Sequence, residues 1–252
     1  MSQKGESSRI VIGLHSCQEV VRVRPKAILN FYIDESKEKE LRELPWIQTL
    51  SQKVKPEKRK RNFFQELGSG HQGVALVVKA SEPVLSEKVF AQSRSTLLAL
   101  DEVEDPTNLG NILRTSWLLN VDGILIPQDR SVKLTPMVCK IASGGAEHVP
   151  VDVVHPLDQK LSELKENGYW VYGLDAAASE SIYDVDFPEK VIIVAGNEGK
   201  GLRKSTLKAC DVLIKIPQVN DHASLNVSTS VAITLSHVQR SFFLVDEGKQ
   251  KK

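Results

Sequence analysis

A polar segment at positions 105–114, DPTNLGNILR, combines residue types that could do chemistry. Asp105 or Asn108 could cap a helix, and Pro106 suits a first helical turn, so helix initiation explains part of the segment. It does not explain Arg114, because a cation near a helix N-terminus opposes the helix dipole. We expect Asn108 and Arg114 to lie near one side of the helix start. Arg114 should then have an anionic partner, for which an RNA phosphate is one candidate.

A second candidate is the glycine-rich segment at positions 196–202, GNEGKGL. Glycine lets a backbone approach a ligand closely and adopt positive φ angles. The phosphate-loop pattern GxxxxGKS/T is absent, because it would need lysine at the position of Leu202, and the dinucleotide pattern GxGxxG is absent too. By itself the segment fits either a ligand-binding loop or a simple connection between two elements.

A third candidate is PQVNDHASLNVS at positions 217–228, which precedes the last apolar stretch of the chain. Ser224 could cap the helix that follows. Asn226 and Ser228 would then stand in its first turn, where both are poor helix formers. We interpret their presence as a functional requirement. His222 alone is weak evidence for a site.

These segments each follow a short apolar run that predicts a strand, and predicted helices lie between the runs. The predicted strands are 96–100, 123–127, 149–154, 169–174, 191–195 and 212–216. The predicted helices are 109–119, 156–167, 203–209 and 224–245. This alternation predicts an α/β domain with a mostly parallel sheet and helices on both faces. In such a sheet ligands bind at the carboxyl ends of the strands, so the three segments should meet at one edge.

The first third of the chain predicts a separate, smaller α/β unit. Aromatic and β-branched residues predict strands at 27–33 and 74–78, and a helix should span 16–23. Helical spacing over 35–50 is interrupted by Pro45. We therefore divide the chain into three parts. They are a small unit of residues 1–80, a linker of residues 81–95 and a larger domain of residues 96–252.

The charge is distributed unevenly, although the formal net charge is only +1. Residues 1–95 hold 17 Lys and Arg against 11 Asp and Glu, whereas the remainder holds 16 against 21. A basic run, KVKPEKRKR at positions 53–61, should be exposed. Either the first part handles a polyanion, or the asymmetry is ordinary variation of surface charge.

Several classes of protein are not expected. No apolar run approaches about 18 residues, so we expect no membrane-spanning helix. The polar residues 1–9 lack the apolar middle of a signal peptide. Cys17, Cys139 and Cys210 are far apart and form no CxxC pair, which argues against a metal site or disulfide framework and favours the reducing cytoplasm.

Together the three segments resemble the signature motifs of the SpoU (TrmH) family of RNA ribose 2′-O-methyltransferases. The matching stretches are DPTNLGNILR (105–114), VAGNEGKGL (194–202) and IPQVNDHASLNVS (216–228). Their order and spacing also match, over about residues 96–245. Upstream, Gly13-Leu14-His15 and the GHQG at 70–73 resemble the small RNA-binding domain of the bacterial 23S rRNA guanosine 2′-O-methyltransferase (RlmB-like) branch.

The resemblance implies a fold, a cofactor and an assembly. The larger domain would be a trefoil-knot methyltransferase domain, and the protein would be a homodimer with its active site near the subunit interface. The cofactor would be S-adenosylmethionine, and no metal would be needed. The residues implied to surround the cofactor are Gly196, Glu198, Gly199, Ile216, Gln218, Leu225 and Val227. The residues implied in catalysis are Asn108, Arg114, Glu198, Ser224 and Asn226.

The chain departs from the family pattern at a few positions. Gln218 stands where methionine is common, Asn220 where glycine is common, and Asn197 where a small residue is frequent. Asn220 tolerates left-handed geometry, so the loop can keep its shape. None of these changes removes a polar position implied in catalysis.

The implied reaction is displacement of the sulfonium methyl by a ribose 2′-oxygen. A guanidinium is almost never neutral, so we expect Arg114 to act as an electrostatic clamp on RNA rather than as a general base. The small unit would bind the RNA. The residues expected to contact RNA are Lys58, Arg59, Lys60, Arg61, His71 and Gln72.

Three interpretations of substrate and function are open. A separate N-terminal domain favours large-subunit rRNA, with guanosine as the favoured nucleotide. The first alternative is the same chemistry on tRNA. The second is an RNA-binding ribosome-assembly factor that has kept the fold without catalysis, against which the intact polar positions argue.

Overall fold

The computed structural model describes residues 8–79, 87–220 and 222–240. The chain divides into two compact units. The N-terminal unit comprises residues 1–82 and 133–148, and the C-terminal unit comprises residues 83–132 and 149–252. Part of the expected linker, residues 81–86, and the expected end of the last helix, residues 241–245, lie outside the described residues.

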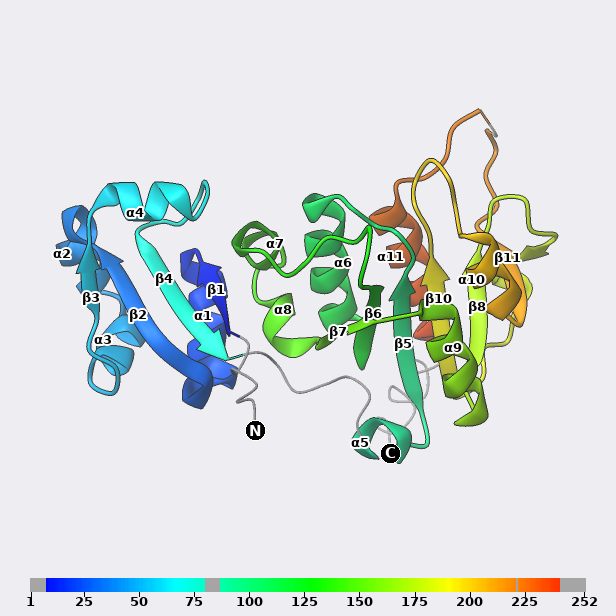
Figure 1. Ribbon diagram of the computed structural model, residues 1–252, viewed down its shortest axis with the longest axis horizontal. Coiled ribbons are helices and arrows are strands. Elements are labelled where there is room, and N and C mark those ends of the chain that lie inside the picture. Colours follow the sequence, from blue (N-terminus) through cyan, green and yellow to red (C-terminus); the bar gives the residue numbers. More distant parts are fainter. Residues whose placement is uncertain (1–7, 80–86, 221, 241–252) are drawn as a thin grey trace, which may run out of the picture. The chain divides into compact units, whose positions relative to one another are not determined.

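The N-terminal unit is built on a four-stranded mixed sheet in the order β1-β4-β2-β3 (Figure 1). β4 runs antiparallel to β1 and β2, and β3 pairs in parallel with β2. The strands predicted at 27–33 and 74–78 are confirmed, and β3 was missed because it lies in the charged run and has no apolar alternation. The four strands are β1 (Ser8–Ile12), β2 (Ile28–Asp34), β3 (Glu57–Arg59) and β4 (Val74–Lys79).

Short helices pack against this sheet. They are α1 (Leu14–Val23), α2 (Glu38–Arg42), α3 (Pro45–Ser51) and α4 (Arg61–Glu66), with 3₁₀ turns at Pro25–Ala27 and Glu35–Lys37. Pro45 is the first residue of α3, where its missing N–H leaves no helical hydrogen bond unmade. Ile12, Phe64 and Ala75 are fully buried and form a core cluster under α4.

A segment from the second half of the sequence belongs to the N-terminal unit. It holds α7 (Pro136–Ile141), which packs against β1, and α8 (Gly145–His148), which packs against α1. The expected division at residues 80 and 96 had placed this segment in the larger domain. Both helices are too short to give a periodic apolar pattern, and their place depends on distant partners.

One buried carboxylate holds this segment in place. Glu147 lies at 2.5 Å from Arg9 and at 3.1 Å from Arg24, and its side chain is only 1% exposed. Arg9 also donates to the carbonyl of Ala146 at 3.1 Å, and Arg24 donates to that of Lys79 at 2.6 Å. A buried carboxylate is tolerated only when it is paired and hydrogen-bonded, and here two guanidinium groups supply both.

We predict that Glu147→Gln destabilises the N-terminal unit by about 3–5 kcal/mol, because two buried cations lose their counter-charge. Urea unfolding followed by circular dichroism measures the change. The matched control is Glu57→Gln, which removes an exposed ion pair with Arg59 and should cost less than about 1 kcal/mol. Equally small losses in both variants would contradict the prediction.

The C-terminal unit contains a seven-stranded sheet in the order β7-β6-β5-β10-β8-β11-β9, and every pair of neighbours is parallel. The six strands expected from the sequence are confirmed, with small shifts at their ends. The strands are β5 (Ser95–Leu100), β6 (Gly123–Pro127), β7 (Val151–Val154), β8 (Trp170–Leu174), β9 (Glu180–Ser181), β10 (Lys190–Ala195) and β11 (Val212–Lys215).

Helices cover both faces of this sheet, as expected (Figure 1). Leu97, Ile192 and Val194 share a core with Leu157 and Leu161 of α9, and α10 packs beside α9. Alternate strand residues point to the opposite face, where α6 and α11 pack against each other. The helices are α5 (Glu87–Phe90), α6 (Pro106–Leu118), α9 (Leu157–Glu166), α10 (Lys204–Ala209) and α11 (Val227–Val238), with a 3₁₀ turn at Ile182–Asp184.

Two further expectations concern membrane-spanning helices and the knot. Within its described parts, no helix combines the length and the apolar character needed to cross a membrane. The trefoil knot implied by the resemblance stays a prediction.

Candidate functional site

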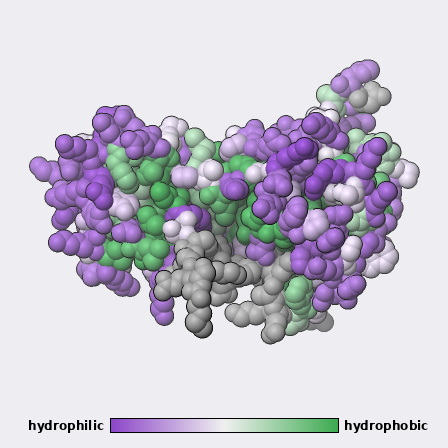
Figure 2. Space-filling view, in the orientation of Figure 1, coloured by the Kyte–Doolittle hydropathy of each residue, from purple (hydrophilic) through white to green (hydrophobic). Residues whose placement is uncertain are grey.

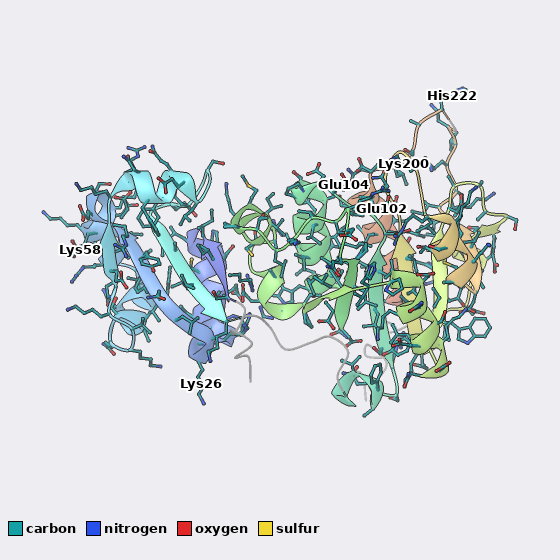
Figure 3. The ribbon with its side chains drawn as sticks, viewed as in Figure 1. Lys26, Lys58, Glu102, Glu104, Lys200 and His222 are labelled. Atoms are coloured by element: carbon teal, nitrogen blue, oxygen red, sulfur yellow. The ribbon has the colours of Figure 1, made fainter. Side chains whose placement is uncertain are left out.

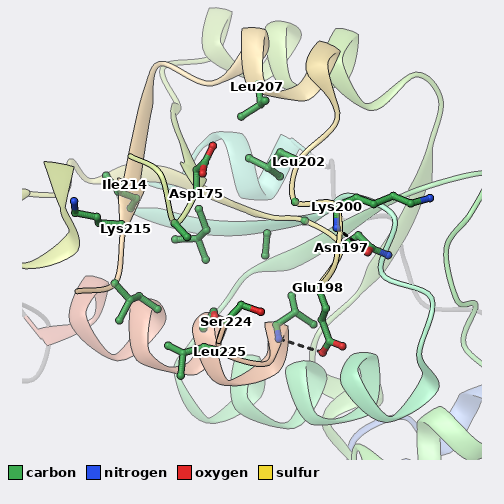
Figure 4. Close-up of a pocket in the computed structure, with 18 of the residues that line it drawn as sticks. Asp175, Asn197, Glu198, Lys200, Leu202, Leu207, Ile214, Lys215, Ser224 and Leu225 are labelled. Carbon is green, nitrogen blue, oxygen red and sulfur yellow. Dashed lines mark hydrogen bonds between the residues drawn. The ribbon is translucent and has the colours of Figure 1, made fainter. Parts of the chain in front are cut away.

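A cavity of about 380 Å³ opens at the carboxyl edge of the parallel sheet (Figure 4). β10, β8 and β11 are neighbours in that sheet, so the loops that follow them meet there. The lining residues are Leu174, Asp175 and Ala176 at and after the end of β8, Ala195, Gly196, Asn197, Glu198, Lys200, Gly201 and Leu202 at and after the end of β10, Leu207 of α10, and Ile214, Lys215, Ile216, Gln218, Ser224, Leu225, Val227 and Ser230 from β11, the loop after it and α11.

The glycine-rich loop after β10 is a tight backbone turn. Asn197 and Gly201 exchange two backbone hydrogen bonds, of 3.1 and 2.8 Å. A Cβ on Gly196 would lie only 2.4 Å from the carbonyl carbon of Gly201, so no larger residue fits there. Gly201 has a φ of +66°, which favours glycine. The side chain of Asn197 accepts a hydrogen bond from the N–H of Gly199 at 3.0 Å, so asparagine stabilises the loop where a small residue is common.

Three side chains form a hydrogen-bonded polar cluster beside the cavity. The Oε1 atom of Glu198 accepts from Asn108 Nδ2 at 2.9 Å and from Asn226 Nδ2 at 2.5 Å. Asn226 Nδ2 also donates to Asn108 Oδ1 at 2.9 Å. The N–H of Val227, at the start of α11, lies at 3.4 Å from the same carboxylate oxygen (Figure 4). A negative charge is favourable at a helix N-terminus, so this position suits Glu198.

The first turn of α11 differs from expectation. Asn226, not Ser224, is the N-cap, and its Oδ1 accepts from the N–H of Ser228 at 2.9 Å. Asn226 therefore precedes the helix, so its poor helix propensity has no cost there. Ser224 is exposed and lines the cavity instead.

The structure places most of the residues implied to bind the cofactor around this one cavity. Those that line it are Gly196, Glu198, Ile216, Gln218, Leu225 and Val227. Gly199 is not among the lining residues, although both its chain neighbours are. Asp175, Lys200 and Lys215 also line the cavity and were not singled out in the sequence. Asp175 directly follows β8, so the rule that ligands bind after parallel strands could have found it.

Arg114 does not lie where the sequence interpretation put it. The helix begins at Pro106 with Asp105 as its N-cap, so Arg114 is in its third turn. Six residues correspond to about 1.7 turns, so Asn108 and Arg114 point about 120° apart. Asn108 is 5% exposed, whereas Arg114 is exposed. The expectation that both lie near one side of the helix start is wrong.

No ion pair or side-chain hydrogen bond of Arg114 is found among the described residues. The anionic partner expected for this residue therefore stays a prediction.

The basic run of the N-terminal unit is exposed, and hydrophilic residues cover α2, β3 and α4 (Figure 2). Lys58 pairs with Glu38 at 2.7 Å, and Arg59 pairs with Glu57 at 2.8 Å. Within the described residues, Lys60 and Arg61 form no ion pair. The two halves of the run therefore differ in how readily they could meet a phosphate.

The two polar residues of the GHQG turn have structural bonds. His71 Nδ1 accepts from the N–H of Gly73 at 2.9 Å, and Gln72 Oε1 accepts from the N–H of Leu14 at 3.0 Å. Gln72 itself has a φ of +54°. Burial lowers the pKa of His71, with nearby Lys37 and Arg61 acting in the same direction and Asp34 opposing them. RNA contact by His71 and Gln72 stays a prediction.

Two other kinds of chemistry find no support in the described residues. Burial raises the pKa of the Cys210 thiol to about 12, which makes it a poor nucleophile near neutral pH. Across the residues that the structure describes, no group of three His, Cys, Asp or Glu residues could hold a metal ion.

Comparisons with known proteins identify relatives of this chain in sequence and in structure. Residues 95–236 match the SpoU rRNA Methylase family, and residues 10–84 match the RNA 2′-O ribose methyltransferase substrate-binding family. The 23S rRNA (guanosine-2′-O-)-methyltransferase RlmB of Pseudomonas aeruginosa is 33% identical over 241 residues, covering 91% of this chain and 95% of that protein.

Two solved structures show the same fold. The SpoU methyltransferase AviRb from Streptomyces viridochromogenes, in complex with AdoMet, has a TM-score of 0.79 at 18% identity and covers 94% of this chain and 91% of its own. The A. aeolicus TrmH/SpoU tRNA modifying enzyme has a TM-score of 0.52 at 25% identity, and the match covers 59% of this chain and 75% of that one. The chain therefore belongs to the SpoU family of RNA 2′-O-ribose methyltransferases.

Proposed function

We propose that this protein transfers the methyl group of S-adenosylmethionine to a ribose 2′-oxygen of large-subunit rRNA, with guanosine as the favoured nucleotide. The observation that carries the proposal is the cavity at the carboxyl edge of the sheet, bordered by the Asn108–Glu198–Asn226 cluster. Similarity to an rRNA guanosine methyltransferase along 91% of the chain supports the choice of substrate.

The cavity fits the cofactor in size and in lining. A volume of about 380 Å³ is within the range of about 300–1,000 Å³ that is typical of small-molecule sites. Leu202, Leu207 and Ile214 offer apolar surface for a planar base. The missing side chain at Gly196 leaves the backbone accessible, and a Cβ there would not fit. When bound, the cofactor supplies a methyl group already activated by a positive sulfur.

The polar cluster is suited to hold the ribose hydroxyl. Glu198 fixes the amides of Asn108 and Asn226, so neither rotates freely. Ser224 lines the cavity with an exposed side chain, so its hydroxyl can donate to or accept from the substrate. Holding the attacking oxygen in line with the methyl group is the main contribution a protein makes to such a transfer.

We propose that Arg114 binds an RNA phosphate and stabilises the developing negative charge on the 2′-oxygen. It is exposed and always charged, so it is ready to bind an anion but poorly suited to remove a proton. We also propose that the protein acts as the homodimer implied by the resemblance.

Two other functions are less well supported. For the tRNA alternative, the match to a tRNA-modifying enzyme covers only 59% of the chain, so it does not account for the N-terminal unit. A non-catalytic RNA-binding factor would have no need for Glu198 to be held by two amides and a helix N-terminus.

The free thiols of Cys17, Cys139 and Cys210 are consistent with action in the reducing cytoplasm.

The direct test is methylation with labelled S-adenosylmethionine of purified large-subunit rRNA and, in parallel, of tRNA. We expect label in rRNA, at a single ribose that resists alkaline cleavage on its 3′ side. Label in tRNA alone would show that the substrate is tRNA and not rRNA. If the protein binds the cofactor but labels neither RNA, nor ribosomal assembly intermediates, the proposed methyltransferase activity would be contradicted.

We predict that Asn226→Ser lowers kcat by about 100-fold or more, because the serine removes an amide that holds the polar cluster. Serine is a good N-cap, so α11 should keep its start and the melting temperature should change little. Single-turnover kinetics and thermal unfolding measure the two effects. A normal rate in a stable variant would show that Asn226 is only a cap.

We predict that Lys60 and Arg61 contribute more to RNA binding than Lys58 and Arg59, because the second pair is already neutralised by Glu57 and Glu38. Lys60→Ala/Arg61→Ala should weaken RNA binding and reduce the slope of log Kd against log salt by about 2. The matched control is Lys58→Ala/Arg59→Ala, measured in the same salt titration. Equal effects of the two double variants would mean that the ion pairs do not matter.

A further inference from the structure

The loop after β5 contacts the glycine-rich loop at two points, although neither Asp101 nor Glu102 lines the cavity. β5 and β10 are neighbours in the sheet, so the loops that follow them run side by side. Glu102 and Lys200, one from each loop, lie at the same edge of the sheet (Figure 3). The carboxylate of Asp101 is fully buried there.

The first contact joins Asp101 to the end of the glycine-rich loop. Asp101 Oδ2 accepts from the backbone N–H of Arg203 at 2.9 Å, and Oδ1 accepts from its Nε at 2.6 Å. The guanidinium Nη2 also lies at 2.6 Å from Oδ1. The backbone N–H of Asp101 donates to Ala195 at the end of β10, at 2.8 Å. One residue thus holds both sides of the loop.

The charges at this contact are matched. Burial alone would lower the pKa of Arg203, but its hydrogen bond and attraction to Asp101 outweigh burial and raise it. A carboxylate with no exposure is stable only when paired in this way. Arg203 is also the N-cap residue of α10, so the same contact fixes where that helix begins.

The second contact joins Glu102 to the start of the glycine-rich loop. Asn197 Nδ2 donates to the carbonyl oxygen of Glu102 at 3.1 Å. Glu102 has a φ of +60°, a conformation that costs a non-glycine residue about 1 kcal/mol or more and persists only when its surroundings hold it. Its carboxylate lies at 3.4 Å from Arg130 and at 3.8 Å from Arg203.

We propose that Asp101 and Arg203 form a clamp that keeps the glycine-rich loop in its cofactor-binding shape, with Asp101 as a positioning residue. Four residues that line the cavity lie between the two contacts, namely Glu198, Lys200, Gly201 and Leu202. α6, which carries Asn108, starts only a few residues after Asp101. This inference rests on the proposed function.

A second ion pair in the same unit, whose Asp211 side chain is 27% exposed, gives a comparison away from the cavity. Asp211 accepts from the backbone N–H of Val171 at 2.9 Å and from Lys165 Nζ at 2.7 Å. It too combines a backbone contact with a cation. It lies just before β11, at the amino edge of the sheet and away from the cavity. If Asp101 served stability alone, removing its charge should lower the melting temperature without a specific loss of cofactor affinity, as expected for Asp211.

The test compares Asp101→Asn with Asp211→Asn in the full-length protein. Calorimetry with S-adenosylmethionine, steady-state kinetics and thermal unfolding are measured on both. We expect Asp101→Asn to raise the cofactor Kd and KM by about tenfold, which corresponds to about 1.4 kcal/mol, with RNA affinity unchanged. Asp211→Asn should lower the melting temperature and leave the cofactor Kd within about twofold of the wild type.

A cofactor Kd that is unchanged in Asp101→Asn, or equally weakened in Asp211→Asn, would overturn the clamp. If Asp101→Asn does not fold, Arg203→Lys replaces it. Lysine keeps the charge but loses the Nε contact, so a smaller rise of about threefold is expected, and no rise would overturn the proposal.

Failure of the proposed function is recognised separately, because the wild type would then leave RNA unlabelled whether or not it binds S-adenosylmethionine. If it binds no S-adenosylmethionine, the clamp is still measurable by hydrogen exchange of the N–H groups of Gly199 and Gly201. Faster exchange of both in Asp101→Asn than in Asp211→Asn supports the clamp, and equal exchange overturns it.

Discussion

The parallel pairing of β5, β10, β8 and β11 is the constraint on which the site depends. Parallel neighbours put all their carboxyl ends at one edge, so loops that are far apart in the sequence become adjacent there. Each loop has a distinct part. The loop after β10 supplies the glycine turn, the loop after β11 supplies Ser224 and Asn226, and the loop after β5 holds the glycine turn and leads into α6. A change of strand order would separate these groups without altering any of them.

Within that frame, one carboxylate organises the polar residues. Glu198 accepts from two amides and lies beside the first N–H of α11. Asparagine at positions 108 and 226 is required because an amide can donate to the carboxylate and still accept from a third group. Asn226 does both, since its oxygen caps the helix while its nitrogen binds Glu198. One side chain therefore makes both the capping hydrogen bond and a hydrogen bond of the site, which explains why the segment could be interpreted as either from the sequence.

The features predicted from the sequence were those set by local pattern. Buried parallel strands are short apolar runs, so β5, β6, β8, β10 and β11 could be recognised, and the glycine turn follows from residue type alone. Features set by distant contacts were missed. The place of α7 and α8 depends on Glu147 meeting two arginines that lie more than a hundred residues earlier in the chain. The direction of Arg114 was missed for a local reason, because a spacing of six residues turns it about 120° away from Asn108 on the helix that begins at Pro106.

Charges are paired in both units, and this limits what the composition says about the surface. In the C-terminal unit the carboxylate of Asp101 is buried and paired with Arg203, and that of Glu198 is hydrogen-bonded, whereas Glu104 is exposed. In the N-terminal unit half of the basic run is neutralised by Glu38 and Glu57, while Lys60 and Arg61 form no ion pair among the described residues. The uneven charge along the sequence therefore overstates the basic surface, because the cations available to a phosphate are fewer than the composition indicates.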